Sequence, residues 1–234
     1  MSLADLSDST QNYLKIIWSI TEHSHEPATT SEVAARAGLR QSTVSDAVKR
    51  LVSAGLALHQ PYGGIELTEQ GKSYALSMIR RHRLIETFLV QTLGYRWDQV
   101  HDEAEVLEHA VSDMMIDRID ALLGYPRRDP HGDPIPSPVG EVEQLLSLTL
   151  ADCAQGQGAG AEVVVERIPD DDPALLRLLA ESGVVPGAVL ILAKNQQQED
   201  MISFALGTGQ VMVLSAEIAH VVMVSPRPSA HPES

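Results

Sequence analysis

The chain has little cysteine, few basic residues and no long apolar run. Cys153 is its one cysteine, which excludes an intramolecular disulfide framework and suits a reducing compartment. No apolar stretch approaches the roughly 18–20 residues needed to span a bilayer. Residues 1–8 are acidic and polar, unlike a signal peptide. We therefore expect a cytoplasmic protein with no membrane association.

Acidic residues outnumber basic ones, with 32 Asp+Glu against 17 Lys+Arg and a net charge of −15. Residues 140–234 hold most of this excess, with 13 acidic and 4 basic residues. Nonspecific affinity for nucleic acid comes mainly from Lys and Arg at phosphates, so the charge argues against a general polyanion binder. Any DNA binding has to depend on a local motif.

A helix-turn-helix pattern lies near the N-terminus. Residues 30–38 predict a short helix that ends at a turn glycine, and residues 41–52 predict a second helix. In the second helix Val44, Val48, Leu51 and Val52 are spaced as one buried stripe. Residues 55–68 predict a hairpin with a Tyr-Gly-Gly tip. This order of elements is typical of a winged helix-turn-helix, although a small helical packing module with a solvated polar face has the same helices.

The face opposite the stripe carries short polar groups first and cations later. Small side chains approach base edges in a major groove, and later cations meet phosphates. The candidate DNA-binding residues, with those just before the helix and at the hairpin tip, are Arg40, Gln41, Ser42, Thr43, Ser45, Asp46, Lys49, Arg50 and Tyr62.

The rest of the chain divides by composition. Residues 71–124 are almost free of Gly and Pro and predict a helical core, whereas five prolines follow between residues 123 and 138. One helix is predicted from Asp172 to about Ser182. Short strands are predicted at 162–166, 189–192, 201–204, 210–214 and 221–224, as in a small SH3-like barrel.

We therefore predict a mainly α protein with β structure. The expected parts are a winged helix-turn-helix domain at 1–72, a helical metal-binding and dimerisation domain at 73–140, a linker at 141–160, a small β-barrel domain at 161–226 and a flexible tail at 227–234.

Two helical faces in the predicted core gather potential metal ligands. His82 and Glu86 are four residues apart, while Glu105, Glu108 and His109 fall within one helical turn. Such faces brought together offer imidazoles and carboxylates without a thiolate, which suits Mn²⁺, Fe²⁺ or Co²⁺ better than structural zinc. The alternative is an ordinary solvated helix surface rich in Glu.

These residues carry a family resemblance over nearly the whole chain. The motifs are Thr-Gln-Asn-Tyr-Leu-Lys at 10–15, Arg-His-Arg-Leu-Ile-Glu at 81–86, His-Asp-Glu-Ala-Glu-Val-Leu-Glu-His at 101–109 and Asp-Pro-His-Gly-Asp-Pro-Ile-Pro at 129–136. With them the chain resembles the diphtheria toxin repressor family of metal-dependent transcriptional regulators, and most closely its manganese-responsive branch. The C-terminal part is similar to the FeoA/SH3-like domain of the longer members.

The resemblance implies two metal sites. Glu105, Glu108 and His109 would form the primary site with Asn12, and His82, Glu86 and His101 a second site that a carboxylate of the C-terminal domain could join. The iron-responsive branch has Cys where Glu105 stands, so Glu105 points to Mn²⁺, with Fe²⁺ or Co²⁺ as substitutes in vitro. The manganese branch has Asp where Asn12 stands, which leaves Asp8 as an alternative ligand.

The implied function is repression of metal-uptake genes by a metal-loaded homodimer on a palindromic double-stranded operator. Metal would select the spacing of about 34 Å at which two recognition helices enter successive major grooves. One rival is a winged-helix regulator that answers to an organic ligand or a partner protein. Another is a helical di-metal enzyme, which needs Glu-x-x-His motifs from two helices. Here Glu105 is followed three residues later by Glu108, and no second copy exists.

Overall fold

The computed structural model describes residues 3–24, 26–59, 63–144, 147–156, 159–170, 172–193, 201–207 and 209–227. They fall into two compact units, each described by itself. The first unit holds the described residues up to His82, with Leu107–Ser112 and Pro136–Val142. The second holds Arg83–Val106, Asp113–Ile135 and the described residues from Glu143 onward. The helices α4 (Glu69–Leu93) and α5 (Val100–Ala110) contribute residues to both units.

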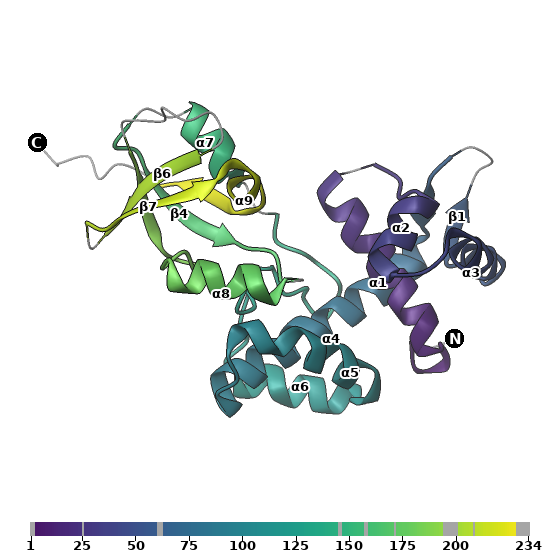
Figure 1. Ribbon diagram of the computed structural model, residues 1–234. Helices are drawn as coiled ribbons and strands as arrows, with labels where there is room; N and C mark the ends of the chain where they lie inside the picture. The colour runs from purple at the N-terminus through teal and green to yellow at the C-terminus, as the bar shows by residue number, and fades with distance from the viewer. Residues whose placement is uncertain are drawn as a thin grey trace, which may run out of the picture. The chain divides into compact units, whose positions relative to one another are not determined.

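The first unit is a helix-turn-helix followed by a β-hairpin, as predicted (Figure 1). After a 3-10 turn (Leu3–Asp5), its elements are α1 (Asp8–Ser24), α2 (Thr30–Ala37), α3 (Gln41–Ser53), β1 (Ala57–His59) and β2 (Ile65–Leu67). The strands β1 and β2 pair antiparallel. The core side chains include Leu14, Ile17, Val33, Val48 and Leu56.

Local signals explain the sharp turn between α2 and α3. Thr29 caps the start of α2, because its hydroxyl accepts from the Glu32 backbone N–H and the Glu32 carboxylate accepts from the Thr29 backbone N–H. The helix ends at Gly38, whose φ of 64° lies in the left-handed region that glycine tolerates. Helix α3 therefore begins at a defined angle to α2.

The buried stripe of α3 differs from the prediction at one position. Val44, Val48 and Leu51 are buried, together with Ala47, but Val52 is 40% exposed. Eight residues rotate an α-helix by about 80° beyond two full turns. Val52 consequently lies outside the stripe that Val44 begins, and Ala47 fills the contact surface on the other side.

The helical part of the second unit leads into a six-stranded antiparallel sheet with small helices around it (Figure 1). Its helices are η2 (Trp97–Gln99), α6 (Asp113–Leu122), α7 (Leu150–Gly156), α8 (Pro173–Glu181) and α9 (Ala216–Val221). The strands, in the order in which they pair, are β3 (Leu148–Thr149), β8 (Met223–Pro226), β4 (Glu162–Arg167), β5 (Val189–Leu192), β6 (Met201–Leu206) and β7 (Val211–Ser215).

The alternating pattern of the strands sets the second core. Val163 and Val165 of β4 are buried, as are Leu190 of β5 and Phe204 of β6. The register pairs Val163 with Leu190 and Ile202 with Leu214. The helix predicted at 172–182 is confirmed as α8, with the Asp172 carboxylate accepting from the backbone N–H groups of Ala174 and Leu175. These findings confirm the predicted fold class.

Two parts of the C-terminal region differ from the predictions. Residues 148–156, within the expected linker, form β3 and α7 and bury Leu150, Ala151 and Cys153 in the second core. Val221 ends α9 and does not begin a strand, because Ser215 caps a six-residue helix there. Helices this short give little periodicity in a sequence. Within the described residues, no helix has the length and apolarity needed to cross a membrane.

Candidate metal centres and DNA-facing helix

Polar side chains from three helices gather in the first unit. Helix α1 supplies Gln11, Asn12 and Lys15, and Lys15 shares a face with the other two because it follows them by four and three residues. The middle of α4 supplies His82, and the last turn of α5 supplies two more side chains. We call this group the α1–α5 cluster, with the members Gln11, Lys15, His82, Glu108 and His109. Asn12 follows Gln11 on α1.

Glu108 is the centre of this cluster and is fully buried. Its Oε2 lies 2.6 Å from Nδ1 of His82, and its Oε1 accepts from Nζ of Lys15 at 2.7 Å. Burial alone would raise the pKa of Glu108, but the hydrogen bond from His82 and the charge of Lys15 hold that pKa below its ordinary value. The carboxylate is therefore ionised and already surrounded by cationic or polarised N–H groups.

His109 presents one ring nitrogen for coordination. Its Nδ1 lies 2.8 Å from Oε1 of Gln11, and a carbonyl oxygen can only accept, so Nδ1 carries the proton. Nε2 then keeps its lone pair, is buried and has no hydrogen-bond partner among the described residues. It lies 3.7 Å from Oε1 of Glu108. A neutral imidazole held in this tautomer is the form that binds metal ions.

Asn12 and Asp8 differ in how they are placed. Oδ1 of Asn12 is buried and has no hydrogen-bond partner within the described chain. Asp8 begins α1 one turn earlier and is exposed. Glu105 lies one turn before Glu108 on α5 and is half-buried. Of the two residues that the sequence offered on the first helix, Asn12 is the one with a buried, uncompensated ligand atom.

A second group of ligand atoms lies in the second unit. Nδ1 of His101 is 3.7 Å from Oε1 of Glu86 and 3.4 Å from Oδ2 of Asp170. Asp170 follows β4 in the C-terminal domain, so the expected carboxylate from that domain is present. Burial lowers the pKa of His101, but the two carboxylates outweigh burial and raise it to about 10.

Asp129 and His131 extend this group on the other side of Glu86. Ligand atoms of these three residues lie within 4.8 Å of one another. Nε2 of His131 lies 2.9 Å from the Trp97 carbonyl oxygen and must donate to it, and Nδ1 faces Oε2 of Glu86 at 3.8 Å. Nδ1 of His131 and Oδ2 of Asp129 are buried without a hydrogen-bond partner in the described residues. We call Glu86, His101, Asp129, His131 and Asp170 the α4–loop cluster.

The carboxylates of the α4–loop cluster shift the pKa values of their neighbours so that the cluster takes up protons. Burial, Asp133 and Glu86 together raise the pKa of Asp129 well above its ordinary range. Burial lowers the pKa of His131, but Glu86 and Asp129 raise it to about 9. Both shifts report an excess of negative charge in a buried place. A bound divalent cation would remove that excess.

Surrounding groups hold the loop that carries Asp129 and His131. Arg83 donates to the Pro134 carbonyl oxygen at 2.6 Å and to Asp133 at 3.0 Å. Gly132 has a φ of 93°, and a Cβ there would lie 1.9 Å from the Glu166 carbonyl oxygen, so only glycine allows this approach to β4. The loop is therefore fixed to both α4 and the sheet.

Sequence reasoning missed several of these residues. The Asp129-Pro-His motif was noticed, but Asp129 and His131 were not assigned as ligands, and Asp170 was not named. Lys15 and Gln11 were also overlooked. An Asp-x-His pair within a proline-rich stretch was the available signal for the first two. His82 was assigned to the second site, and the structure additionally hydrogen-bonds it to Glu108.

The potential metal-binding atoms of both clusters belong to carboxylate, amide and imidazole groups. Oxygen-rich sets with a few imidazoles suit Mn²⁺ and Fe²⁺, and the absence of a thiolate among these residues disfavours a structural zinc site. Nε2 of His109 and Nδ1 of His131 are buried and have no hydrogen-bond partner within the described residues, as expected for atoms that coordinate an ion. The residues present therefore fit divalent metal ions.

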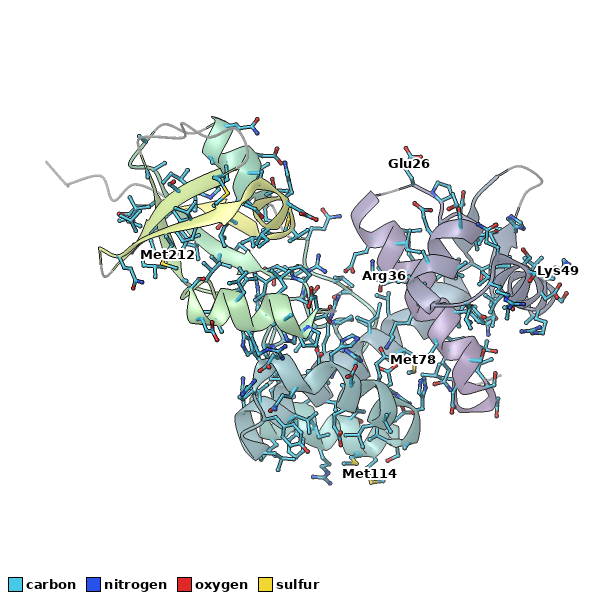
Figure 2. The ribbon with its side chains drawn as sticks, viewed as in Figure 1. Glu26, Arg36, Lys49, Met78, Met114 and Met212 are labelled. Carbon is cyan, nitrogen blue, oxygen red and sulfur yellow. The ribbon has the colours of Figure 1, made fainter. Side chains whose placement is uncertain are left out.

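The candidate DNA-facing helix α3 displays most of the predicted residues. Arg40, Gln41, Ser42, Thr43, Asp46, Lys49 and Arg50 are exposed. Lys49 projects from the outer side of α3 (Figure 2), where its Nζ lies 2.9 Å from Oδ1 of Asp46. Ser45 is different, because it is half-buried and its hydroxyl donates to the Gln41 carbonyl oxygen at 2.9 Å. Tyr62 lies outside the described residues.

Known protein families match almost the whole chain. Residues 5–65 match the family described as iron dependent repressor, N-terminal DNA binding domain. Residues 68–137 match iron dependent repressor, metal binding and dimerisation domain, and residues 148–226 match the FeoA domain.

Individual relatives cover the same length. The iron-dependent repressor IdeR of Mycobacterium leprae is 31% identical over 230 residues, which are 94% of this chain and 98% of the relative. The diphtheria toxin repressor of Corynebacterium glutamicum is 31% identical over 229 residues, covering 95% of this chain and 98% of the relative.

Solved structures are also similar. One described as a manganese-dependent transcriptional repressor in complex with manganese is 43% identical, with a TM-score of 0.85, and the match covers 93% of this chain and 100% of the other. The manganese regulator SloR is 30% identical, with a TM-score of 0.74 and coverage of 93% and 98%.

Proposed function

The chain belongs to the iron-dependent repressor family of metal-dependent transcriptional regulators, and from this premise we propose that it is a Mn²⁺-responsive repressor of metal-uptake genes. Members of this family are DNA-binding repressors and not enzymes. The observation that carries the proposal is the pair of buried ligand sets, each with a buried imidazole nitrogen that has no hydrogen-bond partner in the described chain.

We assign the primary metal site to Asn12, Glu105, Glu108 and His109. Supporting this choice are the ionised, buried carboxylate of Glu108 and the free Nε2 of His109. The second site is assigned to the α4–loop cluster, whose excess negative charge supports a cation there. His82 remains a candidate ligand, with its Nδ1 engaged by Glu108.

Manganese is favoured over iron by the donor atoms and by similarity. Glu105 supplies a hard oxygen at a position where a thiolate would favour softer cations. The structure of the manganese-bound repressor is 43% identical to this chain, whereas the iron-dependent relatives are 30–31% identical. Fe²⁺ is the second candidate, because those relatives are described as iron-dependent repressors.

The proposed mechanism follows from the helices that carry the ligands. Asn12 lies on α1, which packs in the core of the DNA-binding domain, while Glu108 and His109 lie on α5. A bound cation would supply the positive charge that lets these groups converge. Asn12, Glu108 and His109 would then hold α1 against α5 and restrict the orientation of α3, and metal affinity is coupled to DNA affinity to the same extent in both directions.

A homodimer on a palindromic operator completes the proposal. Large apolar side chains of α5 and α6 are exposed in the second unit: Val106 is 72% exposed, Met114 72% and Leu122 67%. Figure 2 shows Met114 projecting outward from α6. These residues lie within the segment that matches a dimerisation domain, and a symmetric dimer would cover them. Two α3 helices related by a two-fold axis would read two half-sites about 34 Å apart.

The test begins with a DNA site selected from random sequence by the Mn²⁺-loaded protein. Binding to that site is then measured without metal and with Mn²⁺, Fe²⁺ (anaerobically), Co²⁺ or Zn²⁺, at one stated salt concentration. We expect tight binding with Mn²⁺ and little without metal. Equal binding in all conditions would support the rival regulator that answers to a non-metal signal.

His109→Ala is the variant that tests the primary site. Removing the free Nε2 should weaken Mn²⁺ binding at least about 100-fold, because even groups outside the ligand shell cost 10–100-fold. Metal-dependent DNA binding should be lost while the fold persists. His220→Ala, an exposed histidine on α9, is the matched control and should behave as wild type. Wild-type Mn²⁺ affinity in His109→Ala would refute the assignment.

A further inference from the structure

Lys15 brings a positive charge into the primary site from the protein itself. It lies on α1, three residues after Asn12, so both side chains share one face of that helix. Its side chain is only 12% exposed, and its Nζ lies 2.7 Å from Oε1 of Glu108, whose side chain is fully buried. The ammonium group thus occupies one oxygen of the carboxylate that is proposed to bind the metal.

The hydrogen bonds of Glu108 leave neither oxygen free of a protein contact. Oε1 accepts from Lys15, and Oε2 lies 2.6 Å from His82. A dication that approaches Oε1 either takes the lone pair that faces the ammonium group and displaces it, or takes the other lone pair and meets the charge repulsion of Lys15 a few ångströms away. Displacement breaks a buried charge-assisted pair, and its loss opposes metal binding.

We propose that Lys15 is a built-in competitor of the metal for Glu108. This inference depends on the proposed primary site. In the metal-free protein the Lys15–Glu108 pair links α1 to α5, and metal binding exchanges this link for coordination. Lys15 therefore lowers metal affinity and raises the metal concentration at which the repressor responds.

The competition is a simple exchange of partners on one carboxylate. No covalent bond within the protein forms or breaks, and the charge of Lys15 moves from Glu108 toward solvent as the dication arrives. Lys15 also prevents a bare, buried carboxylate in the absence of metal, which would be strongly destabilising. Lys15 thus stabilises the metal-free protein relative to the metal-bound protein.

The experiment measures Mn²⁺ affinity by competition with a metal indicator, in a His101→Ala background that weakens the second cluster. Lys15→Met should tighten Mn²⁺ binding at least about tenfold, equivalent to about 1.4 kcal/mol. Without metal its melting temperature should fall below that of wild type, while the increase on adding Mn²⁺ should become larger. Lys72→Met removes the same charge at an exposed position of α4, away from Glu108, and should leave the affinity unchanged.

Two further variants keep the proposal testable if Lys15→Met folds poorly. Lys15→Arg keeps the charge and should bind Mn²⁺ much as wild type does, whereas Lys15→Gln removes the charge, keeps an N–H donor and should bind more tightly. Unchanged or weaker Mn²⁺ affinity in both neutral variants would overturn the proposal. If His109→Ala has no effect on Mn²⁺ binding, the primary site itself is wrong, which is a separate outcome.

Discussion

Asn12 is the neutral member of the proposed primary site, whose other members are two carboxylates and an imidazole. Its Oδ1 is buried and lacks a hydrogen-bond partner in the described part of the chain. Burying an amide oxygen without a hydrogen-bond partner is unfavourable, and a cation bound at this oxygen would offset that cost. An amide oxygen nevertheless attracts a dication less than a carboxylate oxygen does.

Asn12→Asp should raise Mn²⁺ affinity about tenfold, because a neutral oxygen is replaced by an anionic one beside a dication. Titration calorimetry measures the change. Asp8→Asn is the paired control, because Asp8 is exposed at the start of α1. We expect the Mn²⁺ affinity of this variant to match that of wild type. Weaker Mn²⁺ binding in Asp8→Asn, together with unchanged Mn²⁺ binding in Asn12→Asp, would instead identify Asp8 as the ligand.

Helical spacing was sufficient to predict that some candidate ligands share a helical turn. Glu108 and His109 are adjacent on one turn, and both take part in the α1–α5 cluster. His131 and Asp170 could not be found in this way, because one lies in an irregular loop and the other follows a strand. Their approach to α4 depends on tertiary contacts such as those of Arg83 with the loop, which no local pattern encodes.

At the level of elements, α3 carries short polar side chains in its first turns and cations in its second half. Thr43 is exposed in its first turn, and Lys49 lies in its second half. Ser45 was expected to face outward with Thr43, but its hydroxyl already bonds the Gln41 carbonyl oxygen, as Ser side chains in helices commonly do. Thr43 is therefore the better candidate for base reading.

Thr43→Ala should cost about 1–3 kcal/mol at the selected operator and leave binding to random DNA unchanged. Lys49→Ala should weaken binding to both and reduce the salt dependence by about one unit, because one phosphate contact is lost. Fluorescence anisotropy at several salt concentrations measures both effects. Equal losses on operator and random DNA for Thr43→Ala would leave DNA shape as the source of specificity.

The major elements were predictable and the small ones were not. Periodicity gave α3, the hairpin, α8 and most strands, because each has a clear apolar pattern or cap. The short elements β3, α7 and α9 have between two and seven residues, too few for a period to appear. Their positions come from the second core, into which Leu150 and Ala219 are buried.

At the scale of the second unit, Asp98 connects the central helices with the C-terminal domain. Its carboxylate accepts from Arg96 at 2.6 Å and from Arg177 of α8 at 3.2 Å, and its side chain is 2% exposed. The hydrogen bond from Arg96 lowers the pKa of Asp98, burial opposes this, and Arg177 adds to the lowering, which brings the pKa to about 2.

Asp98→Asn should destabilise this unit by about 1 kcal/mol, since both arginines are partly exposed and solvent screens the pairs. Thermal unfolding measures the loss as a shift of a few degrees. Because the pKa is lowered in the folded state, the stabilisation is complete above about pH 4 and is lost as the pH falls from there through 2. The difference in melting temperature between wild type and Asp98→Asn should therefore be smaller at pH 3 than at neutral pH. A difference that stays constant would show that the charge of Asp98 does not contribute to stability.

The scarcity of cations around α3 bears on how the repressor searches a genome. Arg40, Lys49 and Arg50 are the exposed cations at this helix, Asp46 already neutralises one of them, and the whole chain carries a net charge of −15. A strongly basic regulator is retained by any DNA that it meets and slides along it. This protein should dissociate quickly from non-operator DNA and find its operator by repeated collisions from solution. Only a small fraction of the protein should therefore be bound to non-operator DNA when the metal concentration changes.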